Sequence, residues 1–440
     1  MKKINLYKHQ AEALEQTAGK NRVAYYHDMG LGKTFTGAEK MKQLGGRVNL
    51  VICQKSKIDD WYRHFQNNYY SSGADENIIL PHDLTDPDGM TVFKWNIETS
   101  GGCQLVGIIN YDLIFRRPEL LKIRFNTILL DESSMIKNET AKRTKTILKL
   151  KTDNVILLSG TPTGGKYEEL YSQLKLLGWK ISKTQYWTEF IKTRTIDAGG
   201  FKIPIVTGYK NVGRLKRKMR EYGCSFLKTD EVFDLPAQTF TDIKVNPPKE
   251  YKQFQKNKIT EPPPFKYTNG CTMIGDTTLT QMLYSRQLCG AYAAEKIKAL
   301  GDLIESTNDR LIIFYNFNLE LDAIKDICKQ FKRPFSQVNG SVKNLEAYDK
   351  HADSVTAIQY QAGAMGLNLQ KANKIIYFAP PLSSELYEQS KKRIHRIGQE
   401  RPCFYYRLIC KSSIEVKIYE VLEQRKDYTE KLFLKGGRET

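Results

Sequence analysis

The chain has 440 residues, of which 40% are hydrophobic, and this length and composition exclude wholesale disorder and favour two domains. No apolar run approaches the roughly 18–20 residues that a membrane span needs, and the N-terminal residues lack the apolar core of a signal peptide. The 68 Lys and Arg residues against 49 Asp and Glu give a formal charge of +19, which favours a polyanionic partner such as nucleic acid.

Eight cysteines are scattered along the chain, and none of them forms a CxxC pair. Neither a zinc site nor a disulfide framework is indicated by this spacing. We therefore expect a soluble, cytoplasmic protein whose cysteines are reduced.

Short apolar runs alternate with helical patterns along the chain, which is typical of an α/β fold with parallel sheets flanked by helices. Continuous apolar runs of this kind suit strands that are covered on both faces. The predicted strands form an early series at 48–53, 106–109, 127–130 and 155–158, and a late series at 311–314, 355–358 and 374–378.

Between the two series lies a stretch, roughly 165–300, with few strand signals. It contains Pro247-Pro248 and Pro262-Pro263-Pro264 together with polar, aromatic-rich segments. We interpret this stretch as helical additions at about 165–228 and 246–300, with the connection between two lobes near 229–245.

A glycine-rich segment, Asp28-Met29-Gly30-Leu31-Gly32-Lys33-Thr34, follows the apolar run 23–26 and precedes a helical pattern. A strand–loop–helix context is what a phosphate-binding loop requires, because glycines let backbone N–H groups surround phosphates at a helix N-terminus. Lys33 would reach the β- and γ-phosphates of a nucleotide, and the Thr34 hydroxyl would ligate Mg²⁺. The strict GxxxxGK[ST] pattern is not met, because His27 stands where its first glycine belongs.

An acidic pair, Asp131-Glu132, ends the predicted strand at 127–130. In an ATPase, a carboxylate at such a strand end holds Mg²⁺, and its neighbour orients and polarises the attacking water. We assign these roles to Asp131 and Glu132, respectively.

Several segments together resemble the ordered motifs of superfamily-two helicases, and more closely those of Swi/Snf-type DNA translocases. The ending His395-Arg396-Ile397-Gly398-Gln399 is highly characteristic of that family. The matching segments, in chain order, are 7–10, 28–34, 131–132, 159–162, 227–236, 339–341, 362–369 and 389–399.

The resemblance covers residues 6 to about 410 and implies two RecA-like lobes. We expect an N-terminal ATP-binding lobe at 1–228 and a C-terminal lobe at 229–440, with ATP hydrolysed in the cleft between them. Because the chain is close to the length of the minimal motor, we expect a prokaryotic or viral enzyme.

The resemblance also implies roles for single residues. The amide of Gln10 would pair with adenine, as glutamine does elsewhere. Arg393 and Arg396, three residues apart, would lie on one helix face and stabilise the γ-phosphoryl transition state. Ser159, Thr161 and Gln389 would couple the γ-phosphate to lobe movement, and Gly366 would contact the nucleotide.

Nucleic acid is expected to contact loops through its backbone, which gives little sequence preference. The candidate contacts are Lys55, Ser56, Lys57, Tyr111, Asn339, Gly340 and Ser341.

The leading hypothesis is an ATP- and Mg²⁺-dependent motor that translocates along double-stranded DNA as a monomer, with a protein partner supplying specificity. Three alternatives remain open. They are a strand-separating DNA or RNA helicase, a motor that strips proteins from nucleic acid, and a binding scaffold with a degenerate ATPase fold.

Overall fold

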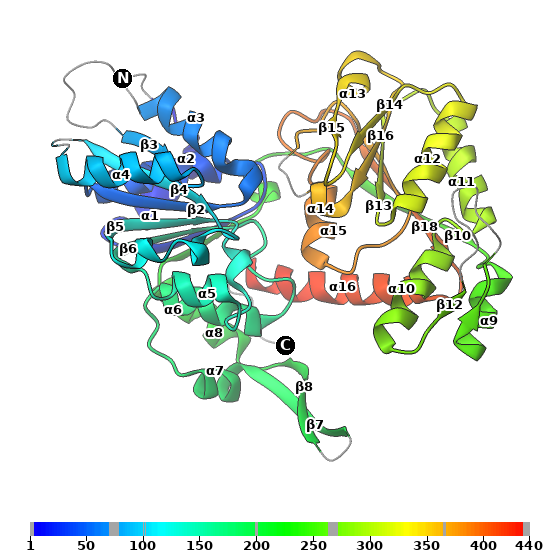
Figure 1. Cartoon of the computed structure of the whole chain (residues 1–440), viewed down its shortest axis with the longest axis horizontal. Helices are drawn as coiled ribbons and strands as arrows, with labels where there is room; N and C mark the ends of the chain where they lie inside the picture. The colour runs from blue at the N-terminus through cyan, green and yellow to red at the C-terminus, as the bar shows by residue number, and fades with distance from the viewer. Residues whose placement is uncertain are drawn as a thin grey trace. The chain divides into compact units, whose positions relative to one another are not determined.

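The computed structural model describes residues 4–69, 79–99, 101, 103–198, 201–262, 272–363 and 367–433 of the chain (Figure 1). The chain divides into two compact units between Val232 and Phe233. The boundary predicted after residue 228 lies four residues earlier. Each unit is built around a seven-stranded sheet flanked by helices, so the predicted α/β fold of two lobes with parallel sheets is confirmed.

The sheet of the first unit has the order β3-β4-β2-β5-β6-β1-β9, and every pair in it is parallel. The early series of predicted strands lies within β2, β4, β5 and β6, whose apolar residues are buried from both sides. The strands are β1 (Arg22–His27), β2 (Val48–Cys53), β3 (Ile79–Asp83), β4 (Gln104–Asn110), β5 (Arg124–Asp131), β6 (Lys151–Leu158) and β9 (Cys224–Leu227).

Helices cover this sheet with apolar stripes. In α3, for example, Ile58, Trp61, Phe65 and Tyr69 recur every three or four residues and are all buried. The helices are α1 (Lys8–Gln16), α2 (Lys33–Leu44), α3 (Ile58–Tyr69), α4 (Pro87–Thr99), α5 (Lys142–Ile147), α6 (Tyr171–Leu176), α7 (Lys183–Phe190) and α8 (Val212–Glu221). Single 3₁₀ turns are η1 (Lys55–Lys57), η2 (Ile114–Arg116), η3 (Pro118–Leu121), η4 (Ser133–Ile136), η5 (Tyr167–Leu170) and η6 (Thr229–Glu231).

An antiparallel hairpin of β7 (Ile191–Ala198) and β8 (Phe201–Tyr209) interrupts the helices at 165–228 and extends away from the rest of the first unit (Figure 1). The expected addition is therefore not purely helical. The hairpin escaped prediction because its strands are not the continuous apolar runs of the central sheet.

The sheet of the second unit has the order β10-β18-β17-β13-β16-β14-β15, and only the β14–β15 pair is antiparallel among these described strands. The late series of predicted strands corresponds to β13, β16 and β17. The predicted strand at 374–378 ends one residue after β17. The strands are β10 (Gln238–Val245), β13 (Leu311–Tyr315), β14 (Phe335–Val338), β15 (Lys343–Asn344), β16 (Val355–Gln359), β17 (Lys374–Tyr377) and β18 (Cys403–Cys410).

The expected helical insertion at 246–300 contains α9, α10 and the start of α11, together with the short antiparallel pair β11 (Ile259–Thr260) and β12 (Met273–Ile274). Across the described part of the chain, no helix combines the length and the apolar character needed to cross a membrane. The helices of this unit are α9 (Lys249–Asn257), α10 (Thr278–Cys289), α11 (Ala294–Glu305), α12 (Asn318–Gln330), α13 (Glu346–Lys350), α14 (Tyr360–Gly363), α15 (Ser384–Lys391) and α16 (Ile414–Phe433).

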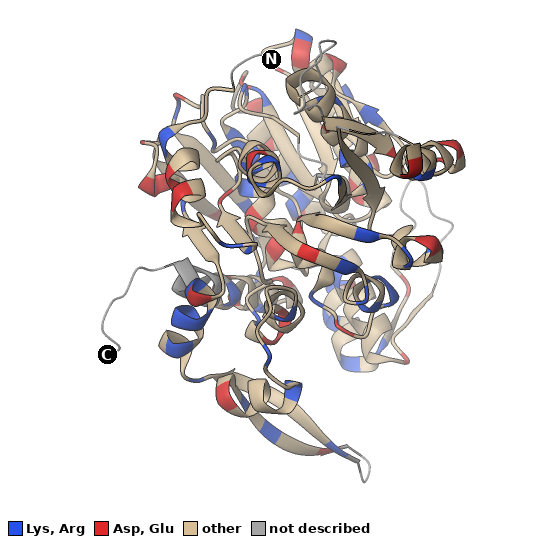
Figure 2. Cartoon of the chain, turned by 90° about the vertical axis from the view of Figure 1, so that its left-hand side faces the viewer, with Lys and Arg blue, Asp and Glu red and all other residues tan. Residues whose placement is uncertain are grey.

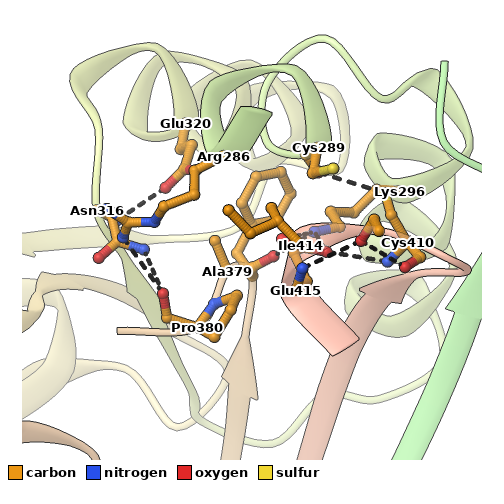
Figure 3. Close-up of polar contacts among 12 residues, drawn as sticks. Arg286, Cys289, Lys296, Asn316, Glu320, Ala379, Pro380, Cys410, Ile414 and Glu415 are labelled. Atoms are coloured by element: carbon orange, nitrogen blue, oxygen red, sulfur yellow. Dashed lines mark hydrogen bonds and ion pairs between the residues drawn. The ribbon is translucent and has the colours of Figure 1, made fainter. Parts of the chain in front are cut away.

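A buried ion pair fastens the start of α16 to the core of the second unit (Figure 3). Lys296 of α11 donates to both carboxylate oxygens of Glu415, at 2.6 and 2.7 Å, and to the carbonyl of Phe378 at 3.1 Å. Glu415 also accepts from the backbone N–H of Cys410. Cys289 and Cys410 lie beside this carboxylate, but its oxygens are already bound by an ammonium group, which suits an ion pair rather than a metal ion.

Candidate active site

The glycine-rich segment forms the turn between β1 and α2, as the sequence predicts. Gly30 and Gly32 have φ angles of 93° and 68°, which favour glycine, and Lys33 is the first residue of α2. The ammonium group of Lys33 donates to the carbonyls of His27 and Asp28 at 2.9 and 3.1 Å. It therefore lies over the loop, within reach of a phosphate that the loop would hold. Leu31 is buried, whereas Met29 and Thr34 are half-buried.

Gln10 of α1 holds the same loop from the other side. Its amide nitrogen donates to the carbonyls of Leu31 and Gly32 at 3.3 and 3.1 Å, and its oxygen accepts from the N–H of Tyr7. A Cβ atom at Gly32 would collide with this amide. The side chain is thus bound to the loop backbone here, and its pairing with adenine stays a prediction.

His27 closes the buried end of β1 directly before the loop. Its Nε2 lies 3.0 Å from the hydroxyl of Ser225, and burial, followed by the charge of Lys33, lowers its pKa to about 3. The imidazole is therefore neutral at cellular pH and adds no charge beside Lys33. Asp28 accepts from the backbone N–H of Thr229 at 3.2 Å, which ties the loop to the segment after β9.

The acidic pair lies at the end of β5, and β6 separates β5 from β1 in the sheet. Trp61 of α3 donates its indole N–H to Oδ2 of Asp131 at 2.9 Å. Glu132 has a left-handed backbone, with φ 54° and ψ 58°, which is uncommon for a residue with a side chain. Backbone strain of this kind often accompanies functional sites, and here it fits a carboxylate held in one direction.

Ser159, which directly follows β6, contacts the second carboxylate of this pair. Its hydroxyl lies 3.5 Å from Oε2 of Glu132 and accepts from the N–H of Thr161 at 3.1 Å. The structure thus brings Glu132 together with Ser159, one of the three residues expected to couple the site to movement, and Ser159 in turn contacts Thr161. The Thr161 hydroxyl is buried without a hydrogen-bond partner in the described residues, which suits a group that gains a partner in another state.

Besides Trp61, two further residues that support the acidic pair and its neighbours were not predicted in that role. Tyr111, expected to contact nucleic acid, is buried, and its hydroxyl donates to the carbonyl of Asp131 at 2.8 Å. Gln173 of α6 accepts from the hydroxyls of Ser133 and Tyr26 and donates to the carbonyl of Pro162. The sequence carries no motif for Trp61 or Gln173, because each is an ordinary member of an amphipathic helix.

The donor atoms of this site fit a magnesium nucleotide. Mg²⁺ prefers oxygen ligands, and Asp131 offers a carboxylate while Thr34 offers a hydroxyl. Both groups are half-buried near the edge of the sheet where β1 and β5 end, so both remain accessible to a nucleotide bound at the loop. In open α/β sheets this carboxyl edge is where ligands bind.

In the second unit, Arg393 and Arg396 follow α15 rather than lying on it. The helix ends at Lys391, so the expected placement of both arginines on one helix face is wrong. Arg393 is buried and its carbonyl accepts from the N–H of Leu369, whereas Arg396 is half-buried and burial lowers its pKa. Gln389 is buried within α15, and Gly366 lies outside the described residues.

Gln399 fixes the segment that carries these arginines. Its amide nitrogen lies within hydrogen-bond distance of the carbonyls of Gln370 and Ala372, at 3.0 and 2.8 Å. The characteristic ending of the motif therefore has a structural role within the second unit.

The expected nucleic-acid contacts divide into exposed turns and the buried Tyr111. Lys55 and Ser56 are exposed in η1, at the carboxyl end of β2, while Lys57 pairs with Asp60 at 2.6 Å. In the second unit, the carboxamide oxygen of Asn339 accepts from the N–H groups of Ser341 and Val342, which forms a tight turn with Gly340 exposed.

Comparison with protein families gives two adjoining matches. Residues 16–293 match the SNF2-related domain, and residues 295–398 match the helicase conserved C-terminal domain. The first of these matches alone covers more than half of the chain.

Individual relatives are distant in sequence. The chain is 25% identical to YwqA of Bacillus subtilis, provisionally named an ATP-dependent helicase/translocase, over 92% of this chain and 46% of that protein. It is 24% identical to the ISWI chromatin-remodeling complex ATPase ISW1 of Saccharomyces cerevisiae, over 92% of this chain and 38% of that protein. The chain thus spans less than half the length of these relatives.

Among solved structures, the chain aligns with a SWI2/SNF2 ATPase core of Sulfolobus solfataricus determined in complex with double-stranded DNA. The alignment covers 97% of this chain and 93% of that one, at 18% identity and a TM-score of 0.42.

Proposed function

Since the chain belongs to the SNF2-related family of helicase-like ATPases, we propose that it hydrolyses ATP to translocate along duplex DNA. The observation that carries this proposal is the set of groups at one edge of the first sheet. Lys33 follows β1, Asp131 ends β5 with Glu132 directly after it, and Ser159 follows the strand between them. The relatives named as ATP-dependent translocases and remodelling ATPases support the same activity.

In this proposal the first unit supplies the chemistry of hydrolysis. Lys33 neutralises the β- and γ-phosphates, Thr34 and Asp131 hold Mg²⁺, and Glu132 orients the attacking water. When bound, the metal offsets the charge that develops on the phosphates. Loss of the γ-phosphate changes the surroundings of Glu132, and Ser159 passes this change along the backbone to Thr161.

The second unit supplies Arg393 and Arg396 to the same nucleotide as the transition state forms. Both arginines leave α15 on a segment anchored by Gln399, so a rigid segment presents them. Repeated binding and hydrolysis would then shift one unit along the DNA backbone in each cycle. The exposed turns at 55–57 and 339–341 are the proposed contacts with phosphates.

Further properties stay predictions. They are the monomeric state, a separate protein that supplies specificity, and a location in the cytoplasm of a prokaryotic or virus-infected cell.

The experiment that tests the function is steady-state ATP hydrolysis without nucleic acid and with duplex DNA, single-stranded DNA or RNA. We expect the strongest stimulation by duplex DNA, and its abolition by Lys33→Ala or Glu132→Gln. Lys149→Ala, at an exposed position on the opposite edge of the sheet, is the matched control. Full turnover in both site variants would show that the reaction occurs elsewhere.

Translocation and strand separation are distinguished by a second assay. A duplex translocase displaces a triplex-forming third strand but leaves the duplex paired, whereas a helicase releases a labelled strand. Stimulation chiefly by single-stranded DNA or RNA would support a motor that moves along that nucleic acid instead of duplex DNA. Absence of hydrolysis in every condition would favour the binding scaffold.

A further inference from the structure

The hairpin of β7 and β8, which we call the arm, is exposed on both of its faces. Every side chain from Lys192 to Thr195 and from Lys202 to Ile205 is exposed. Isolated two-stranded hairpins are marginally stable in water, so an arm that buries neither face gains little from its own packing. Its persistence in the fold points to a surface that binds something outside the first unit.

The two faces of the arm follow from its register. Arg194 lies opposite Ile205 and Ile196 lies opposite Ile203, so these four side chains share one face. The other face carries Thr195 opposite Pro204, and Asp197 opposite Lys202. The first face thus combines a cation with three isoleucines, of which Ile203 and Ile205 are 46% and 44% exposed.

The base of the arm is fixed to the body of the first unit. The ring of Tyr209 stacks on Tyr167 with centroids 4.4 Å apart, and its hydroxyl donates to Glu168 at 2.9 Å. The backbone N–H of Lys210 donates to the carbonyl of Phe190, and the Asn211 amide donates to that of Glu189. The arm therefore leaves the body in a defined direction instead of hanging from a loose loop.

Lys and Arg residues lie beside this base, together with the carboxylates of Glu168 and Glu189 (Figure 2). A hollow of about 370 Å³ is lined by Lys192 and Lys210 together with Thr188, Thr193 and the ring of Trp187. Two ammonium groups and two hydroxyl groups are suitable donors for a phosphate oxygen.

The next helix, α8, continues the positive surface. Arg214, Arg217 and Arg220 recur every three residues and are exposed along one side of it, although Arg214 lies 3.5 Å from Glu189. On the described strands of the arm itself, Asp197 is the one acidic residue, against Lys192, Arg194 and Lys202. The balance of charge therefore favours a polyanion over a neutral or basic protein surface.

We propose that the arm lies in a groove of duplex DNA. A two-stranded ribbon has a width that the major groove admits, and apolar side chains in that groove contact the methyl group of thymine. Arg194 and Lys202 bind phosphates on the groove walls, Lys192 and Lys210 bind one phosphate at the base, and Ile203 and Ile205, which share one face of the arm, face the bases. This inference rests on the proposed function, in which the protein moves along duplex DNA. It adds an element that keeps the protein bound to the DNA between successive cycles of ATP hydrolysis.

The test measures the affinity of the full chain for a fluorescent 30-base-pair duplex, without nucleotide and over a range of salt concentrations. Arg194→Ala with Lys202→Ala removes two cations from the arm. Lys122→Ala with Lys149→Ala removes two exposed cations near the starts of β5 and β6 and serves as the matched control. We expect the arm variant to bind at least 10-fold more weakly and the control to bind like wild type.

The salt dependence gives a sharper outcome. Each lost phosphate contact reduces the slope of log affinity against log salt by about 0.9, so the arm variant is expected to lose about 1.8. A photoreactive residue at position 203 is expected to cross-link the duplex. Thermal unfolding and ATP hydrolysis without DNA should be unchanged, since the arm holds no part of the ATP site.

Two failures are distinguishable. If the arm variant keeps the wild-type affinity and salt slope, and position 203 forms no cross-link to the duplex, in a protein whose ATPase is stimulated by duplex DNA, the arm proposal is overturned and a protein partner becomes the alternative. Absence of duplex binding and stimulation in the wild-type chain would instead overturn the proposed function.

Discussion

The indole N–H of Trp61 donates a hydrogen bond of 2.9 Å to Oδ2 of Asp131, from a helix that lies 70 residues earlier in the chain. Tyr111 binds the backbone of the same residue, so the carboxylate expected to hold Mg²⁺ is oriented through both its side chain and its carbonyl. Partners of this kind orient metal ligands, and their loss typically weakens metal binding 10- to 100-fold.

We therefore expect Trp61→Phe to raise the Mg²⁺ concentration needed for half-maximal ATP hydrolysis by about 10-fold or more. Phenylalanine retains most of the packing in this buried cluster but has no N–H group to donate. The measurement is a Mg²⁺ titration of hydrolysis at saturating ATP. Trp95→Phe is the control, because Trp95 is 61% exposed on α4. A wild-type titration curve for Trp61→Phe would show that this hydrogen bond does not position the ligand.

The contact between Gln10 and Gly32 gives a second prediction. Gly32→Ala places a Cβ atom against the Gln10 amide and demands a φ of 68° from a residue that disfavours it. We expect a rise of at least 10-fold in the KM for ATP. Gln10→Ala removes the collision, so Gly32→Ala should cost less when it is made in the Gln10→Ala background.

A double-mutant cycle of KM values measures this difference. Strict additivity of the two changes would show that backbone strain at Gly32, and not the collision, limits the loop. Gly19→Ala is a suitable control, since Gly19 also has a positive φ, of 72°, but a Cβ atom added there would meet nothing within 4 Å.

The central strands of both sheets could be predicted because burial on two faces leaves continuous apolar runs. All six residues of β2 are buried, and the run at 48–53 coincides with that strand. Edge strands leave a weaker signal. Six residues of β10 from Gln238 to Ile243 are exposed or half-buried, so its sequence reads as a polar connection.

The sequence of the arm does contain a pattern that predicts a hairpin, but this pattern is not a continuous apolar run. Its sequence alternates β-branched and polar residues on either side of Gly199-Gly200, which is typical of a hairpin. In the candidate site, motifs identified Lys33, Asp131, Glu132 and Ser159, because their chemistry demands particular residue types. Trp61, Tyr111 and Gln173 act through contacts between distant elements, and nothing in the local sequence reveals them.

Removal of one partner from the buried Lys296–Glu415 pair is expected to destabilise the second unit strongly. Lys296→Ala leaves Glu415 buried without its counter-ion. We expect this to lower the free energy of opening of the second unit, as measured by hydrogen exchange, by about 3–5 kcal/mol. Lys296→Met with Glu415→Gln should cost less, because it removes both charges and keeps an acceptor for the Cys410 N–H. Lys350→Ala, which breaks the exposed pair with Glu346, should have no measurable effect.

Hydrogen exchange of the β13 and β17 amides is the appropriate measurement for this pair, because the four tryptophans all precede residue 233 and report on the first unit. Equal destabilisation by Lys296→Ala and by the double change would contradict the argument from uncompensated charge.

Glu320 at the start of α12 predicts a pH dependence in the second unit. One carboxylate oxygen accepts from the N–H groups of Asn316 and Phe317, at 2.7 and 3.2 Å, and the other is buried with no hydrogen-bond partner among the described residues. Burial raises its pKa from 4.5 to about 7, against the opposing effect of the two N–H groups. Between these values the unfolded chain has lost a proton that the folded chain retains, so the free energy of opening falls as the pH rises from about 4.5 to 7 and then levels off.

At about 1.4 kcal/mol per unit of pKa, the total loss from this one group is about 3 kcal/mol. Glu320→Gln cannot ionise, so its free energy of opening should lack this fall. Hydrogen exchange of the β13 amides, with wild type and variant compared at the same pH, cancels the intrinsic pH dependence of exchange. The difference between the two proteins should therefore change by about 3 kcal/mol between pH 4.5 and 8, with Gln gaining relative to wild type as the pH rises. A difference that is constant with pH would mean that the Glu320 carboxyl is ionised in the folded chain throughout, because the N–H groups and nearby cations then outweigh its burial.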